Sequence, residues 1–94
     1  MKKLDAREKK RLKRVEKNIK EAEVLFKHVI PEQLSERQRE YYDMRLQGMY
    51  NAEIGREMGI TRQGADGIYQ QIMKKANKNK QIFETMLEMK EEEN

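Results

Sequence analysis

The chain has 94 residues, of which 36% are hydrophobic and 40% are charged, and its formal net charge is +4. This length suits one small domain, and the shortage of Val, Ile and aromatic runs excludes a sheet, so we expect an all-α fold. The lack of cysteine excludes disulfides and cysteine-based zinc sites. Because no apolar run is long enough for a membrane span or signal sequence, we expect a cytoplasmic protein with no membrane contact.

The segment 1–30 is predicted to form a basic amphipathic helix from about Asp5 to His28, which Pro31 prevents from continuing. Ten of the first 20 residues are Lys or Arg, and three are acidic. We expect this helix to be an oligomerisation arm or a phosphate-binding surface. Alternatively, its basic residues simply form a solvated helix face. Apolar residues recur at spacings of three and four, as in a coiled-coil seam: Leu12, Val15, Ile19, Ala22, Phe26 and Val29.

Residues 34–76 are predicted to contain three helices separated by two glycine turns. The first helix begins after Ser35, whose spacing to Gln38 is typical of a capping box. It should end near Leu46, because Gly48 favours the left-handed conformation that closes a helix.

The second and third helices of this segment are joined by a turn at Gly59. Asn51 is expected to cap the short helix 52–58, and Thr61 is expected to cap the third helix. This order of elements is typical of a helix-turn-helix, whose last helix lies in a DNA major groove. The inward-facing positions of the third helix are Ala65, Ile68 and Ile72.

The polar residues 77–80 are predicted to break the helix, so that residues 81–94 form a separate C-terminal helix with a frayed acidic tail. One side of that helix is apolar. A domain of this size cannot easily cover both this side and the N-terminal seam, so at least one should join the subunits of a homodimer. The apolar residues are Ile82, Phe83, Met86 and Leu87.

Segment 34–76 resembles two related families of bacterial DNA-binding domains. These are the four-helix domain of LuxR-type regulators and the promoter-recognition region of sigma factors, including small sigma-like phage and plasmid regulators. The resemblance implies an all-α helix-turn-helix bundle, here with a long N-terminal helix and a C-terminal helix added. The residues that carry it are Leu34, Glu36-Arg37-Gln38-Arg39-Glu40, Gln47-Gly48, Glu53-Ile54 and Gly59-Ile60-Thr61.

The same resemblance implies the residues that contact double-stranded DNA. Thr61 would cap the recognition helix and contact a phosphate. Arg62 would be suited to hydrogen bonds with guanine, and Gln63 to hydrogen bonds with adenine. Two departures are Gly64 and Gly67, which cost about 1 kcal/mol each relative to Ala inside a helix. The groove-facing positions are Arg62, Gln63, Asp66 and Gln70, and the further basic candidates are Lys74, Arg37, Arg56, Arg11 and Arg14.

Asp66 would place a negative charge near phosphates, although a carboxylate can also accept a hydrogen bond from cytosine.

From the motif and the resemblance together we expect a sequence-specific transcriptional regulator, acting as a homodimer at a promoter. One alternative is a protein-interaction module that binds RNA polymerase, a sigma factor or another host protein without reading DNA. Another is the DNA-recognition subunit of a phage terminase.

No pattern in the sequence indicates an enzyme, a cofactor or a metal site. His28 is the only histidine, and Glu91, Glu92 and Glu93 form a terminal acidic run rather than an acid/base pair. No phosphate-cradling glycine loop is present. The four tyrosines have helical spacing that favours packing over stacking on single-stranded bases.

Overall fold

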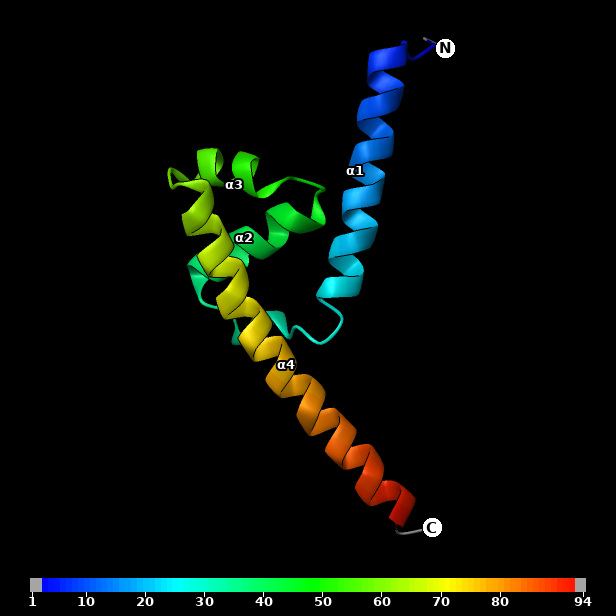
Figure 1. Cartoon of the computed structure of the whole chain (residues 1–94), viewed down its shortest axis with the longest axis vertical. Coiled ribbons are helices and arrows are strands. Elements are labelled where there is room, and N and C mark those ends of the chain that lie inside the picture. The colour runs from blue at the N-terminus through cyan, green and yellow to red at the C-terminus, as the bar shows by residue number, and fades with distance from the viewer. Residues whose placement is uncertain (1–2, 93–94) are drawn as a thin grey trace.

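The computed structural model describes residues 3–92, which form an all-α fold without a strand (Figure 1). In Figure 1, α2 and α3 lie between α1 and the first half of α4, while the end of α4 projects away from them. The elements are α1 (Ala6–Leu25), a 3-10 turn (Pro31–Gln33), α2 (Glu36–Leu46), α3 (Asn51–Met58) and α4 (Arg62–Glu92).

The first helix begins as predicted but ends three residues earlier. The Asp5 side chain accepts a hydrogen bond from the Glu8 amide at 2.8 Å, which caps the helix N-terminus. The helix ends at Leu25, because Phe26 leaves helical geometry while its side chain enters the core. Pro31 then opens the 3-10 turn that leads into α2.

The capping box predicted at the start of α2 is confirmed. The Ser35 hydroxyl accepts from the Gln38 amide at 3.2 Å, and the Gln38 side chain accepts from the Ser35 amide at 3.1 Å. The predicted end at Leu46 is also confirmed, and Gly48 has the expected positive φ of 91°. Because this φ strains residues with a Cβ, glycine makes the tight exit from α2 possible.

The cap predicted for α3 is wrong, while the glycine turn after it is confirmed. The residue before the helix is Tyr50, whose amide donates to Glu53 Oε1 at 3.0 Å, and Asn51 is the first helical residue. The Asn51 side chain is instead engaged by residues of α2 and α4. Gly59 ends α3 with a φ of 69°.

Thr61 caps α4, because its Oγ1 accepts a hydrogen bond from the Gly64 amide at 3.0 Å. The break predicted at residues 77–80 is wrong, and no separate C-terminal helix exists, because α4 runs unbroken to Glu92. Tertiary contacts outweigh the weak helix propensity of these polar residues. Asn79 donates to the backbone oxygen of His28 at 3.0 Å and to Gln33 Oε1 at 2.9 Å.

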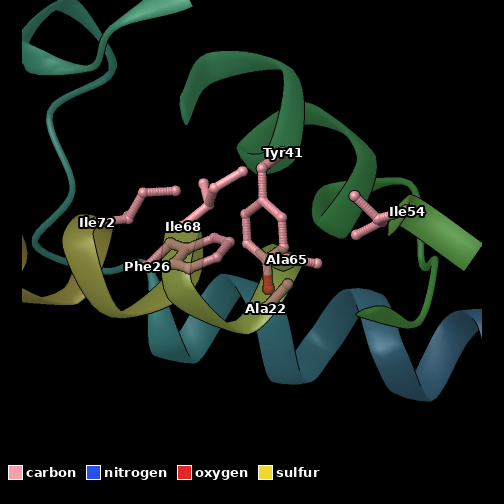
Figure 2. Close-up of a cluster of buried hydrophobic side chains, with 7 residues drawn as sticks. All are labelled: Ala22, Phe26, Tyr41, Ile54, Ala65, Ile68 and Ile72. Atoms are coloured by element: carbon pink, nitrogen blue, oxygen red, sulfur yellow. The ribbon is translucent and has the colours of Figure 1, made fainter. Parts of the chain in front are cut away.

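The core lies between the C-terminal half of α1, α2, α3 and the first half of α4 (Figure 2). Figure 2 shows side chains from all four helices pointing toward one another around Tyr41. Aromatic packing contributes here, since the Phe26 ring lies 5.3 Å from Tyr42 and 6.3 Å from Tyr69. The buried residues of this core are Ala22, Phe26, Tyr41, Ile54, Ala65, Ile68 and Ile72.

The two predicted apolar stripes end up in different surroundings. The N-terminal seam packs mostly on its own chain, since Ala22 and Phe26 are buried and only Leu12 remains 47% exposed. The stripe near the end of α4 has much less cover, because Phe83 is 54% exposed beside His28 and Met86 is 62% exposed. The structure therefore leaves one long apolar surface on the part of α4 that projects from the body.

Candidate nucleic-acid interface

The first turn of α4 presents two polar side chains to solvent. The Thr61 hydroxyl anchors the turn through Gly64, and the next two residues, Arg62 and Gln63, are exposed. The helix N-terminus carries partial positive charge and favours an anion such as phosphate. Arg62 and Gln63 thus extend from a fixed helix end rather than from a flexible loop.

An accessible polar face continues along α4 from this turn. Gln63, Gln70 and Lys74 recur at spacings that place them opposite the buried Ala65, Ile68 and Ile72, and all three are exposed. Gly67 lies on the same outward face, and a Cβ added there would meet nothing within 4 Å. This face is therefore unobstructed by the rest of the described chain.

Asp66 differs from the other candidates in α4, because it is half-buried and hydrogen-bonded. Its carboxylate accepts from the Asn51 side-chain amide. The side-chain oxygen of Asn51, Oδ1, in turn accepts hydrogen bonds from Tyr41 Oη at 2.6 Å and from Arg45 Nη1 at 3.2 Å. The structure thus gives Asp66 a packing role between α3 and α4, and base contact by Asp66 stays a prediction.

The phenol of Tyr41 lies at the centre of this network. Burial raises the pKa of Tyr41 above its ordinary value of 10.0, and the neighbouring Arg45 guanidinium opposes part of that rise. Arg45 also lies over the Tyr69 ring, 5.5 Å from its centroid. The network therefore joins α2, α3 and α4 directly behind the exposed face of α4.

The N-terminal helix approaches the same region from the other side. The Arg14 guanidinium lies 4.9 Å from the centroid of the Tyr50 ring, and Asn18 donates to the backbone oxygen of Gly48 at 3.0 Å. Tyr50, Asn18 and Arg62 line one open pocket of about 380 Å³. The structure thus places Arg14 of α1 beside Tyr50, which lines the same pocket as Arg62, and the sequence pattern gave no means to foresee this.

A cationic face continues along α1 beyond Arg14. Arg7, Lys10, Arg11 and Arg14 line a shallow pocket of about 400 Å³, and all four are exposed. Such a row of cations attracts phosphates whatever the base sequence. Arg11 and Arg14 therefore occupy positions that are suited to backbone contacts.

The remaining basic candidates, Arg37 and Arg56, stand on other helices. Arg37 lies in the first turn of α2 and Arg56 lies in α3, and both are exposed. Neither forms an ion pair within residues 3–92. Their contribution to a shared surface with α4 stays a prediction.

Among residues 3–92 the only ion pair joins Arg39 and Asp43, 3.4 Å apart. The cations of α1 and the start of α4 thus hold no ion-pair partner in this part of the chain. Within the same residues, no three His, Cys, Asp or Glu side chains gather as metal ligands. None of the helices found there combines the length and apolar character needed to cross a membrane.

Comparison of the chain with protein-family models, with curated proteins and with solved structures gives no match. Tyr50 and Asn51 were missed as neighbours of the candidate interface. The sequence marked Asn51 only as a helix cap and Tyr50 only as a packing residue, and contacts between distant helices gave both their place.

Proposed function

We propose that this protein binds double-stranded DNA, with the first three turns of α4 in the major groove. Under this proposal α3, the Gly59 turn and α4 form a helix-turn-helix of the LuxR-like and sigma-like kind. The observation that carries the proposal is the exposed polar face of α4, which begins at a capped helix N-terminus and is held from behind by α3.

The chemistry of this face suits base reading. Arg62 can donate two hydrogen bonds to guanine, and Gln63 can form a paired contact with adenine. Gln70 and Lys74, two and three turns further along, face the same way and suit an adjacent base edge or phosphate. Asp66, if it reaches the groove, would accept from cytosine.

Arg11 and Arg14 would supply contacts to the DNA backbone that are independent of base sequence. Arg37 and Arg56 are the further backbone candidates. One recognition helix reads only a few base pairs, so the proposal includes a homodimer that binds two half-sites about one DNA turn apart. Regulation would then follow from promoter occupancy, either by blocking polymerase or by recruiting it as a sigma-like subunit does.

The test begins with selection of bound fragments from random DNA. Binding to the preferred fragment is then measured over a salt series for the native chain and for Arg62→Ala and Gln63→Ala. Each substitution should weaken specific binding by about 1–3 kcal/mol. Gln81→Ala is the matched control, because Gln81 is exposed on α4 far from its first turn.

Substitution of Arg11 and Arg14 by Gln should weaken binding to all fragments alike and reduce the salt slope by nearly one unit per lost contact. Unchanged binding in both Arg62→Ala and Gln63→Ala would remove α4 from the reading role. An unchanged salt slope in the α1 variants would remove α1 from backbone contact.

A second candidate function is a protein-interaction module that binds RNA polymerase, a sigma factor or another protein without reading DNA. The observation that favours it is the exposed apolar side of α4, where Met86 and Met89 offer adaptable contacts. Such a module would show almost no salt-dependent DNA affinity. A phage terminase subunit that recognises DNA is a further alternative, and selected fragments from a packaging site would distinguish it.

A further inference from the structure

The core-facing stripe of α4 continues beyond the core. Ala65, Ile68, Ile72 and Ala76 pack inside the chain, and Asn79 is anchored to His28. Steps of three or four residues then lead to Phe83, Met86 and Lys90 on the same helix face. Every residue from 80 to 92 is exposed. The Phe83 ring still lies 6.3 Å from the ring of His28, so the fully uncovered part of the stripe begins at Met86.

The core-facing stripe of α1 also continues beyond the core, toward the other terminus. Ala22 is buried and Ile19 and Val15 are half-buried, and the same spacing then leads to Leu12 and Glu8. Every residue from 3 to 14 is exposed. The two uncovered helix ends are therefore similar in length, and each extends a stripe that is buried elsewhere in its own helix.

The two helix ends carry opposite charge. Residues 3–14, which lead into and open α1, contain seven basic and two acidic side chains, whereas residues 82–92 of α4 contain four acidic side chains and one basic one. Two copies that paired α4 with α4 would bring like charges together, which opposes association. Pairing of α1 with α4 of a second copy brings opposite charges together and covers both stripes.

The spacing along the two stripes matches in an antiparallel pairing. Counted from the helix start, α1 offers Glu8, Leu12 and Val15, in steps of four and three. Counted backwards, α4 offers Lys90, Met86 and Phe83 in the same steps. The only acidic residue of this part of the α1 stripe thus faces the only basic residue of the α4 stripe. The contact is centred on Leu12 and Met86, because Val15 also packs against Gly48 of its own chain.

The two ends lie far apart in one chain, at opposite ends of its 58 Å long axis (Figure 1). A twofold rotation about an axis perpendicular to the long axis would bring the α1 end of one copy to the α4 end of the other, at both ends of the dimer. Such an arrangement closes with two identical contacts and leaves no stripe uncovered. We propose that the chain forms a twofold dimer through reciprocal antiparallel packing of α1 residues 6–14 on α4 residues 82–92 of a second copy.

This proposal rests on the homodimer included in the proposed function, and it names the surface that forms it. The first test is sedimentation of the native chain at micromolar concentration, with a dimer expected. The second test uses the lack of native cysteine, which makes an engineered disulfide unambiguous. Leu12→Cys and Met86→Cys chains are mixed in a glutathione buffer, and the mixed disulfide is followed by mass.

The mixed disulfide should form at least about tenfold faster than a disulfide in either chain alone, because the interface raises the effective concentration of the pair. Lys13→Cys mixed with Thr85→Cys is the matched control, since both positions lie on the opposite faces of the same helices. A native chain that sediments as a monomer would overturn the proposal. So would a Met86→Cys chain that cross-links with itself as fast as the mixture does.

The register is tested by exchanging one charge pair. Each of Glu8→Lys and Lys90→Glu also changes the net charge of its helix end, so the two are combined in a double-mutant cycle. If Glu8 faces Lys90, the double variant should dissociate about tenfold less than the separate effects of the two substitutions predict, because only the double variant has opposite charges at this pair. Helix content measured by circular dichroism controls for a folding defect. Effects of the two substitutions that simply add in the double variant would reject this register.

None of these measurements contains DNA, so the interface and the DNA-binding proposal fail separately. Arg62→Ala should leave the dimer intact, because Arg62 lies at the other end of α4 from the α4 segment in the interface.

Discussion

The side-chain amide of Asn51, at the start of α3, donates a hydrogen bond to the carboxylate of Asp66 in the second turn of α4. Asn51 also accepts from Tyr41 of α2, so one amide connects three helices. Both residues are half-buried, where an unpaired polar group would destabilise the fold. This contact fixes the direction in which α4 leaves the Gly59 turn, and hence the direction of the exposed face of α4.

Asn51→Ala should lower the free energy of unfolding by about 1.5–3 kcal/mol, because it removes the partners of the Asp66 carboxylate and the Tyr41 phenol. Urea denaturation measures the change. Asp43→Ala is the matched control. Asp43 forms an exposed ion pair with Arg39, whose loss should cost less than about 1 kcal/mol. Equal effects of the two substitutions would contradict a structural role for the network.

Gly67→Ala should stabilise the fold by about 1 kcal/mol and weaken DNA binding. Alanine favours the helix over glycine, and its added Cβ would meet nothing within 4 Å. On the proposed groove-facing side, however, the same methyl would hold the helix away from DNA. Thermal unfolding and a binding titration measure the two effects.

Gly64→Ala gives a comparison for the stability gain, because a Cβ there would make ordinary contacts of 3.4 Å with Thr61 and 3.5 Å with Ile60. A Gly67→Ala chain that is more stable and binds the selected fragment unchanged would show that this side of α4 does not approach DNA closely.

Gly48→Ala should destabilise the contact between α1 and the turn after α2. A Cβ at Gly48 would lie 2.7 Å from Val15 Cγ1 and 2.9 Å from the Val15 backbone oxygen, so α1 would have to shift. The positive φ adds about 1–2 kcal/mol of strain for any residue other than glycine. Hydrogen exchange of the α1 amides should therefore accelerate, and the free energy of unfolding should fall.

Gly59→Ala separates these two effects. Gly59 also has a positive φ, but a Cβ there would meet nothing within 4 Å. Its substitution should cost backbone strain alone and leave α1 exchange unchanged. If both variants accelerated α1 exchange equally, the close approach at Gly48 would have no special role.

Stability should fall as the pH rises above about 10, because burial raises the pKa of Tyr41 above its ordinary value of 10.0. In that range the unfolded chain releases the phenolic proton while the folded chain retains it, so ionisation favours unfolding. Below pH 10 the Tyr41 phenol is protonated in both the folded and the unfolded state, so its full contribution to stability is present. Urea denaturation at pH values from about 8 to about 11, which bracket the ordinary pKa of tyrosine, measures the decline in stability.

Tyr41→Phe should flatten this decline while lowering stability at neutral pH by about 0.5–1.5 kcal/mol, through loss of its hydrogen bond. Tyr50→Phe is the control, because Tyr50 is exposed and its phenol has no comparable burial. A decline that persists unchanged in Tyr41→Phe would assign the effect to other groups.

Local signals in the sequence determined most of the helix boundaries. The Ser35 capping box, the Gly48 and Gly59 turns and the Thr61 cap act within a few residues of the chain, so a pattern of neighbouring residues is sufficient to predict them. The spacing of Ala65, Ile68 and Ile72 likewise identified the buried face of α4, because helical periodicity alone decides which positions share a face.

Tertiary structure decided what these local patterns could not. Residues 77–80 remain helical because Asn79 bonds to the chain near the end of α1, and propensity contains no information about such a distant partner. Asn51 turns away from capping because Tyr41 and Asp66 come within hydrogen-bonding distance only in the folded chain. The same packing covered the seam of α1 from Val15 onward and left Leu12 and the end of α4 exposed. Each of these outcomes depends on which helices meet, and that is a property of the whole chain rather than of any segment.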